Sequence, residues 1–207
     1  MPVPQGNFSY QSDVKAMQAD DDSEEIRFEH TFSQKTYMVG YPKVTLFASC
    51  PDHDDMDIYV QLRKADIRGN ILQSLNIPEE ALGLPLQDIP SVNPVKYLGP
   101  TGILRASHRD ISQKLSKENR PIHDHQRIKL ITPGAITKLE IGLWPTAIAF
   151  EKGEKLVLKI SGHHMILAEF EPLRGTFTSG NRGRHLIHFG GETGSSLDIP
   201  LVDIDGI

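Results

Sequence analysis

Three groups of side chains in the sequence have residue types that could bind a metal ion. They are the run Asp52-His53-Asp54-Asp55-Met56-Asp57, the run His123-Asp124-His125 and the pair His163-His164. The acidic run contains no loop glycine, and the histidines have no cysteine or identifiable third ligand beside them. We therefore favour solvated turns and loops over metal sites, and we expect neither a metal nor a cofactor.

The sequence also lacks the motif that supplies the nucleophile of most serine hydrolases, Gly-x-Ser-x-Gly. Gly194-Ser195-Ser196 has no second glycine at the required spacing. Ser107, His108 and Asp110 are too close in sequence for the base to face the nucleophile from a separate segment. Cys50, the single cysteine, ends an alternating apolar run and is interpreted as a buried hydrophobic residue. We expect no catalytic residue in this chain.

Four residues are candidates for contacts between domains or for the wall of a binding cleft. Arg105, His108 and Arg109 lie on or near one predicted strand and could donate hydrogen bonds across an interface. Trp144, the single tryptophan, could stack on a carbohydrate, but the apolar strand before it and Pro145 after it favour packing in the core or between domains.

Composition excludes several classes of function. The net charge is -5, with acidic and basic residues interspersed, so no basic surface for nucleic acid is expected. No apolar run approaches the ~20 residues that span a bilayer. The first 15 residues do not resemble a secretory signal, and one cysteine cannot form an intramolecular disulfide. A cytoplasmic or other intracellular location is therefore expected.

The elements that must position these residues are strands. Between 135 and 160, Leu139, Ile141 and Leu143 share one face of an alternating run that Trp144-Pro145 stops. A short apolar run and a second alternating run follow, separated by a turn at 151–154. This stretch predicts three short antiparallel strands.

The rest of the chain continues the pattern. We count about ten strands and one or two short helices in loops, including strand candidates at 165–170 and 184–189 and a helix near 77–82. Residues 64–96, which lack a regular apolar pattern, are predicted to form a long loop that leaves the sandwich. Residues 1–25 are interpreted as a linker and residues 26–207 as one all-β domain, a β-sandwich or jelly roll.

Five segments also carry a resemblance to a known family. In chain order, they are Thr36–Pro42, Ser49–Leu62, Gly102–Arg109 (GILRASHR), Leu143–Thr146 (LWPT) and His185–Gly191 (HLIHFGG). Together they resemble the C-terminal non-catalytic domain of the X-prolyl dipeptidyl peptidase and cocaine esterase group of serine hydrolases (CocE/NonD hydrolases).

The resemblance implies a galactose-binding-like jelly roll that packs against an α/β-hydrolase domain and helps to form its substrate cleft. The parent enzyme would hydrolyse esters, amides or X-prolyl peptides, and this domain could also supply contacts for a homo-oligomer. A different class remains open, namely a free-standing β-sandwich that binds a carbohydrate or a partner.

Overall fold

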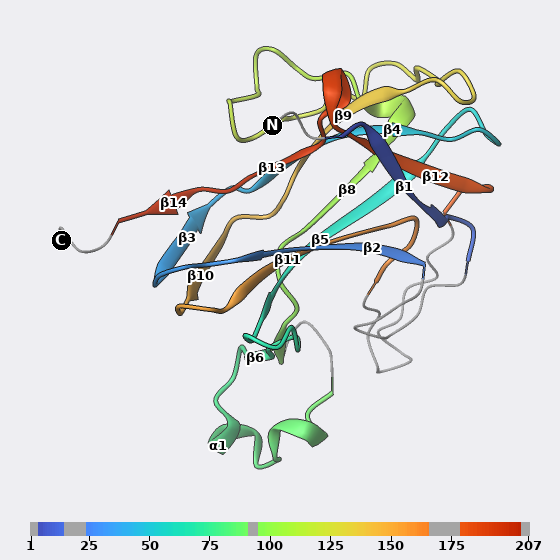
Figure 1. Ribbon diagram of the computed structural model, residues 1–207. Helices are drawn as coiled ribbons and strands as arrows, with labels where there is room; N and C mark the ends of the chain where they lie inside the picture. Colours follow the sequence, from blue (N-terminus) through green and yellow to red (C-terminus); the bar gives the residue numbers. More distant parts are fainter. Residues whose placement is uncertain (1–3, 15–23, 91–94, 166–178, 204–207) are drawn as a thin grey trace.

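The alternating apolar runs fold into antiparallel sheets that stack face to face (Figure 1). The computed structural model describes residues 4–14, 24–90, 95–165 and 179–203. The first sheet contains β1 (Gly6–Gln11), β12 (Arg184–Phe189), β4 (Lys43–Ser49), β13 (Ser196–Asp198) and β9 (Thr137–Gly142). The second sheet has the order β2 (Glu25–Thr31), β11 (Lys155–Ser161), β5 (Asp57–Ala65) and β8 (Thr101–Arg105).

Smaller elements complete the architecture. A third sheet has the order β10 (Thr146–Phe150), β3 (Thr36–Gly40) and β14 (Leu201–Val202), and β6 (Ser74–Leu75) pairs with β7 (Lys96–Tyr97). The short helices described are α1 (Glu79–Leu82), η1 (Leu86–Asp88), η2 (Ala106–His108) and η4 (Gly191–Thr193). The expected all-β sandwich is confirmed; its galactose-binding-like type stays a prediction.

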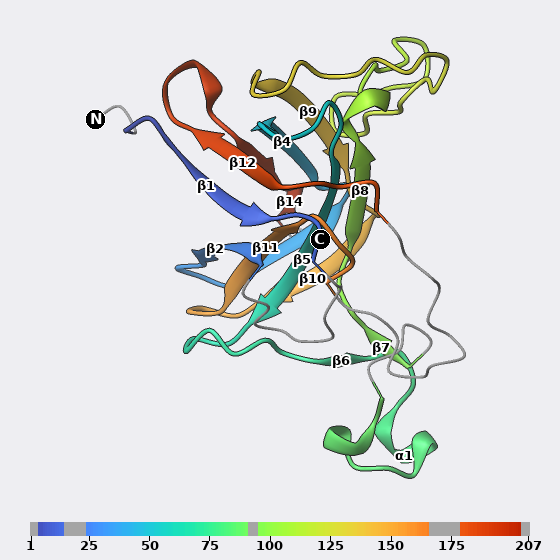
Figure 2. The same ribbon diagram turned by 90° about the vertical axis from the view of Figure 1, so that its right-hand side faces the viewer.

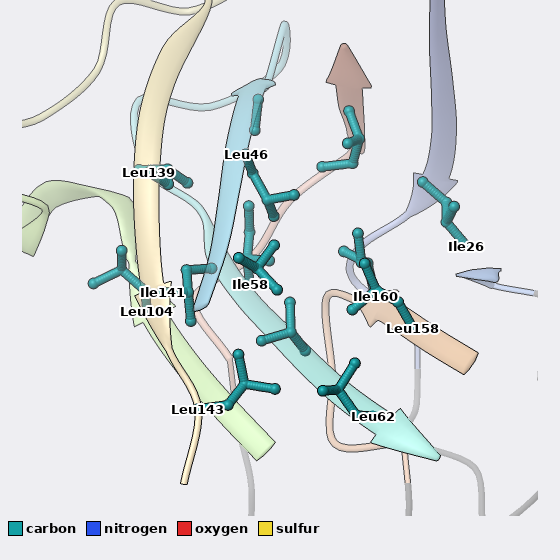
Figure 3. Packing of buried hydrophobic residues seen from close by; sticks show 14 of the residues in the cluster. Ile26, Leu46, Ile58, Leu62, Leu104, Leu139, Ile141, Leu143, Leu158 and Ile160 are labelled. Carbon is teal, nitrogen blue, oxygen red and sulfur yellow. The ribbon is translucent and has the colours of Figure 1, made fainter. Parts of the chain in front are cut away.

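The core lies between the first two sheets, where alternate residues of each strand point inward (Figure 3). Each of these side chains is buried, and burying one leucine or isoleucine contributes about 1.5–3 kcal/mol to stability. The inward residues include Leu46 of β4, Leu139 and Ile141 of β9, Ile58 and Leu62 of β5, and Leu158 and Ile160 of β11.

The predicted three-strand stretch is present, but its strands do not pair with one another. β9 pairs with β4, β10 pairs with β3, and β11 lies between β2 and β5. The 25 residues from 137 to 161 therefore contribute to each of the three larger sheets. This arrangement was not evident from alternation, because alternation identifies a strand and its faces but not its neighbour.

One side of the sandwich is closed where β8 approaches β9. A Cβ atom on Gly102 of β8 would lie 2.7 Å from the carbonyl oxygen of Gly142 in β9, which is too close for any larger residue. Trp144, just after β9, donates its backbone N–H to the carbonyl of Thr101 at 3.1 Å. The two sheets thus meet along this edge, and the opposite edge is formed by β1 and β2 (Figure 2).

The structure differs from the sequence expectation near the N-terminus. Residues 6–11, within the range interpreted as a linker, form β1 and pair along their whole length with β12. Tyr10 is the buried residue of this strand, and the sequence there shows no clear alternation of apolar and polar residues. The strand candidate at 165–170 lies outside the described residues from 166 onward.

The predicted excursion and its short helix are confirmed. After β5 the chain leaves the sandwich, and α1 begins directly after Pro78, which has the extended backbone expected before a first helical turn. Figure 2 shows this segment projecting away from the sheets before β7 returns the chain to them.

A histidine is buried where β1 meets β12. His185 is completely buried, and its Nδ1 atom is 3.0 Å from the hydroxyl of Tyr10. The Nε2 atom is also buried and has no hydrogen-bond partner among the described residues. Burial lowers the pKa of His185 to about 4, despite opposing attraction from Asp57 and Asp13. The folded protein therefore holds a neutral imidazole.

We predict that this histidine makes the protein less stable in mild acid. Between pH 6.5 and about 4, the unfolded chain binds a proton that folded His185 rejects, so the free energy of unfolding falls as the pH falls through this window. The complete loss from His185 is about 3 kcal/mol.

Urea unfolding of the wild type and of His185→Gln at pH 7 and pH 5 measures the effect. The glutamine variant should lose less stability between the two pH values than the wild type does. An identical loss in both proteins would contradict the assignment.

Candidate functional site

The β8 side of the molecule carries the candidate site. It comprises the outward residues of β8, Trp144, whose backbone is hydrogen-bonded to Thr101, and residues 128–131, whose backbone is hydrogen-bonded to η2 just after β8. In the second sheet β8 pairs with β5, and its Ile103 and Arg105 point outward. Four large apolar side chains of these segments are exposed: Ile103 (52%), Ile128 (72%), Leu130 (54%) and Trp144 (73%). Apolar groups gathered on one side are typical of a surface that contacts a partner.

Trp144 is not in the core, so that part of the expectation is wrong. Leu143, the preceding residue, points inward and is buried, and alternation therefore turns Trp144 outward. Its backbone N–H donates a hydrogen bond to the carbonyl of Thr101. Trp144 lines a hollow of about 340 Å³ together with Tyr59 and Tyr97. Its alternative assignment, packing between domains, remains a prediction.

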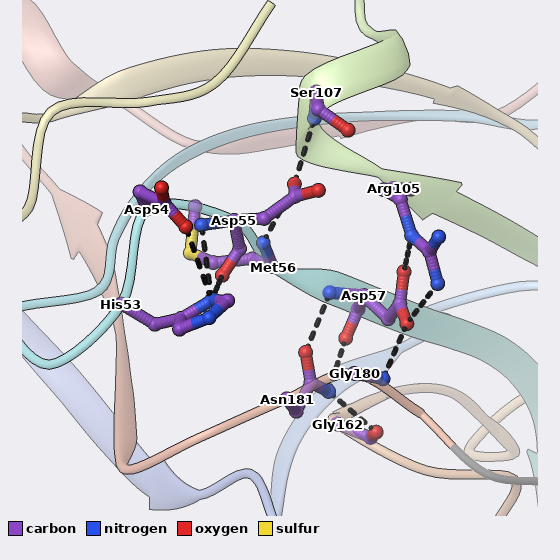
Figure 4. A network of polar contacts seen from close by, with 10 residues as sticks. All are labelled: His53, Asp54, Asp55, Met56, Asp57, Arg105, Ser107, Gly162, Gly180 and Asn181. Atoms are coloured by element: carbon purple, nitrogen blue, oxygen red, sulfur yellow. Dashed lines mark hydrogen bonds and ion pairs between the residues drawn. The ribbon is translucent and has the colours of Figure 1, made fainter. Parts of the chain in front are cut away.

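Arg105 is fixed by a carboxylate at the start of β5 (Figure 4). Its Nε and Nη2 atoms donate to the two carboxylate oxygens of Asp57 at 2.7 and 2.9 Å. The backbone N–H of Gly180 donates to the same carboxylate at 3.2 Å. The fork geometry restricts the guanidinium to one orientation, while half of the Arg105 side chain stays exposed.

Asn181 joins this ion pair to the backbone. Its Oδ1 accepts the N–H of Asp57 at 2.6 Å, and its Nδ2 donates to the carbonyls of Asp57 and Gly162, both at 2.8 Å. The amide is buried, so these bonds are shielded from water. Asp57 and Asn181 thus connect the start of β5 to two segments that follow β11.

The charges of the pair are fixed by these contacts. Burial alone would raise the pKa of Asp57, but hydrogen bonds from Arg105 and from the backbone of Gly180 lower it below its usual value. The hydrogen bonds that Arg105 donates to the Asp57 carboxylate raise the pKa of Arg105. Both groups are therefore ionised at neutral pH.

Arg109 and two backbone contacts hold the segment that carries Ile128 and Leu130. Arg109 donates through Nη1 to the carbonyls of Ala106 and Lys129. Lys129 donates its backbone N–H to Ser107, and Ile131 donates its own to Asp54, both at 2.8 Å. Residues 128–131 therefore run beside η2, and we call them the strap. The hydrogen bonds of Arg109 are all made within the domain.

The histidines do not form a metal site in the described part of the chain. The rings of His108 and His125 lie 5.3 Å apart, and His123 is hydrogen-bonded through Nε2 to the carbonyl of Glu140 at 3.1 Å. No group of three potential ligands among the described residues has the geometry for a metal ion. His108 keeps its Nδ1 atom buried without a partner in the described structure, and we assign it no role.

The acidic turn has structural contacts. One Asp55 oxygen accepts the N–H groups of Met56 and Ser107, at 2.9 and 2.8 Å (Figure 4). Asp52 accepts the N–H of Arg184 at 3.0 Å. These bonds join the turn to η2 and to the start of β12.

The serines that could act as nucleophiles are also in structural positions. Ser107 is buried, and Ser195 donates to the carbonyl of His188 while accepting the N–H of Phe47. Ser49 lies 2.9 Å from Nε2 of His188, but only 3% of Ser49 is exposed. A buried hydroxyl cannot reach a substrate carbonyl, so this pair is not an active site.

Sequence reasoning proposed Arg105, His108, Arg109 and Trp144 as contact residues, and the structure places all four on or next to β8; their role in contacts stays a prediction. It missed Ile103, which alternation on β8 turns outward, and Ile128 and Leu130, whose exposure depends on the path of the segment that carries them. It also missed Asn181, because its partner Asp57 is 124 residues away. Among the described residues, no helix is long and apolar enough to cross a membrane.

Comparison with known proteins gives a family and a fold. A family model described as "X-Pro dipeptidyl-peptidase C-terminal non-catalytic domain" matches residues 5–198. A CocE/NonD family hydrolase from Staphylococcus aureus is 28% identical, with a TM-score of 0.77 over 97% of this chain and 33% of that one. No curated protein sequence matches the chain.

More distant structures share the fold alone. An aminopeptidase from a marine sediment Thaumarchaeota archaeon is 14% identical, with a TM-score of 0.62 over 98% of this chain and 34% of that one. An α-amino acid ester hydrolase is 16% identical, with a TM-score of 0.61 over 95% and 33%. The chain spans about a third of the length of each of these proteins.

We predict that Asn181 is a major contributor to stability. Asn181→Ala removes three hydrogen bonds and leaves backbone groups of Asp57 and Gly162 buried without these partners, which should cost at least about 2 kcal/mol. Asn70→Ala, in an exposed turn, is the matched control and should cost less than about 1 kcal/mol. Equal midpoints of urea unfolding for the two variants would contradict this role.

Proposed function

The chain belongs to the family of X-Pro dipeptidyl-peptidase C-terminal non-catalytic domains, and from this premise we propose that it is the accessory domain of a larger serine hydrolase. In that enzyme it packs against an α/β-hydrolase domain. The family match over residues 5–198 is the observation that carries the proposal.

The β8 side supports a docking role and suggests where it occurs. Ile103, Ile128, Leu130 and Trp144 expose apolar surface there, and aromatic and aliphatic side chains of this kind dominate the centres of protein interfaces. The relatives compared above are about three times as long as this chain, so a large partner region is available to cover it.

We further propose that this docking places one edge of the sandwich at the substrate cleft. The parent enzyme then hydrolyses esters, amides or X-prolyl peptides through an acyl-enzyme on its own serine. The present chain supplies a rigid wall and no reacting group. Arg105, held by Asp57 and half exposed, is the polar residue of the β8 side best placed to contact the partner.

One observation favours a second candidate, a free-standing module that binds a carbohydrate or a partner. Trp144 lies beside Tyr59 and Tyr97 around the same hollow, and aromatic rings at a hollow can stack on sugars. Binding on a glycan array that is lost in Trp144→Ser would favour this module over the accessory domain.

The mass of the native protein in its source is the first test. If the proposal is correct, an antibody against this domain should detect a protein of roughly 70 kDa, since 23.1 kDa is about a third of the parent's mass. A native band at 23.1 kDa that is bound to no hydrolase subunit would contradict it.

Trp144 provides a test of the docking side. In the parent enzyme, Trp144→Ser should lower the thermal midpoint of the hydrolase domain, while the isolated domain changes by less than about 0.5 kcal/mol because the ring is exposed. Ile67→Ser removes a similarly exposed apolar side chain from the turn after β5 and serves as the control. If both variants leave the parent unchanged, the β8 side is not the docking side.

A further inference from the structure

A second feature lies on the opposite edge of the sandwich from the β8 side. Between β2 and the β12–β13 segment, a groove of about 430 Å³ opens into the core. Its floor includes Leu46, Ile160 and Ile187, which are buried core residues. In Figure 2, β1 and β2 lie on the left of the molecule and β8 lies on the right. The groove is therefore separate from the proposed docking side.

Aromatic rings form one wall of this groove. Phe28 and Phe189 line it, and Phe8 of β1 packs against both, with ring centroids 5.3 and 5.0 Å away. Phe8 thereby joins the edges of the two sheets, and Phe8 and Phe28 remain partly open to solvent. A concave, largely apolar site of several hundred Å³ has the dimensions of a small-molecule site.

The inner polar side chains of the lining, His188 and Ser195, are hydrogen-bonded, its acidic residue is ion-paired, and His30 of β2 lies at the exposed rim. Burial lowers the pKa of His188, so its imidazole is neutral at pH 7, and Nε2 is hydrogen-bonded to Ser49. Ser195 uses its hydroxyl as donor and as acceptor. Glu29, the acidic residue of the lining, is ion-paired with Lys155 at 2.6 Å and with Arg27 at 2.8 Å.

We propose that this groove binds a small uncharged organic molecule through an aromatic or branched aliphatic group. Glu29 is already ion-paired and the inner side chains are apolar or hydrogen-bonded, so the groove offers little compensation for a buried ligand charge, which would lose its hydration on entry. The floor and the phenylalanine wall gain contact with a hydrocarbon group instead. A protein surface packed across the opening would fill such a recess poorly unless a side chain entered it.

The test uses the neutral fluorescent probe N-phenyl-1-naphthylamine with the purified chain. We expect saturable fluorescence enhancement with one site per chain. Ser196→Trp places a large side chain at the exposed rim and should raise the dissociation constant at least about tenfold. Glu192→Trp, an exposed residue that does not line the groove, is the matched control and should leave it unchanged.

The ligand's charge is tested by competition, which also covers the case in which Ser196→Trp does not fold. Neutral 2-naphthol should displace the probe, and 2-naphthalenesulfonate, of similar shape but charged, should not. Absence of saturable binding, equal displacement by both compounds, or equal binding by both tryptophan variants would overturn the proposal.

Two further measurements separate this site from the docking side. Trp144→Ser should leave probe binding unchanged, so a failed docking proposal does not affect this result. In the parent enzyme the groove should still bind the probe; loss of binding there would identify the groove as a surface covered by another domain and would overturn the proposal.

Discussion

Chain continuity between residues 137 and 161 is the constraint on which the rest of the structure depends. β9, β10 and β11 follow one another through two tight turns, yet each pairs in a different sheet. The three sheets therefore cannot move apart without breaking the ladder of at least one of these strands. Because β9 and β11 also contribute inward leucines and isoleucines, the same stretch supplies both the connection and a large part of the core.

The hydrogen bonds of Arg105 and Arg109 hold the β8 side of the molecule in place. Arg105 donates hydrogen bonds to Asp57, and Arg109 donates to the backbone carbonyls of Ala106 and Lys129 inside the domain. These bonds fix β8 and residues 128–131, so that Ile103 and Leu130 are exposed on a rigid backbone. A surface that is already ordered loses less conformational entropy when it associates, which suits the docking role proposed for it.

Local sequence patterns predicted the strands, but they could not predict which distant segments would contact one another. Alternation located β4, β9, β11 and β12, and Pro78 located the start of α1. The same alternation implied that Trp144 faces away from Leu143, but the neighbouring apolar residues suggested burial instead. Asn181 gave no local signal, since its role arises from residues 57 and 162. The strand β1 was missed because few of its residues are buried.

The pairing of β1 with β12 has a consequence for how the domain assembles. The ladder joins residues 6–11 to residues 184–189, so nearly the whole chain forms the loop that it closes. Closing so long a loop has a high entropic cost, and contacts of this range slow folding. During synthesis β1 stays unpaired until β12 has been made, and so does one edge of β4, whose other edge pairs earlier with β9. A nascent chain of this kind exposes unpaired strand edges until β12 is made. During that time a chaperone or an already folded neighbouring domain would protect these edges from aggregation.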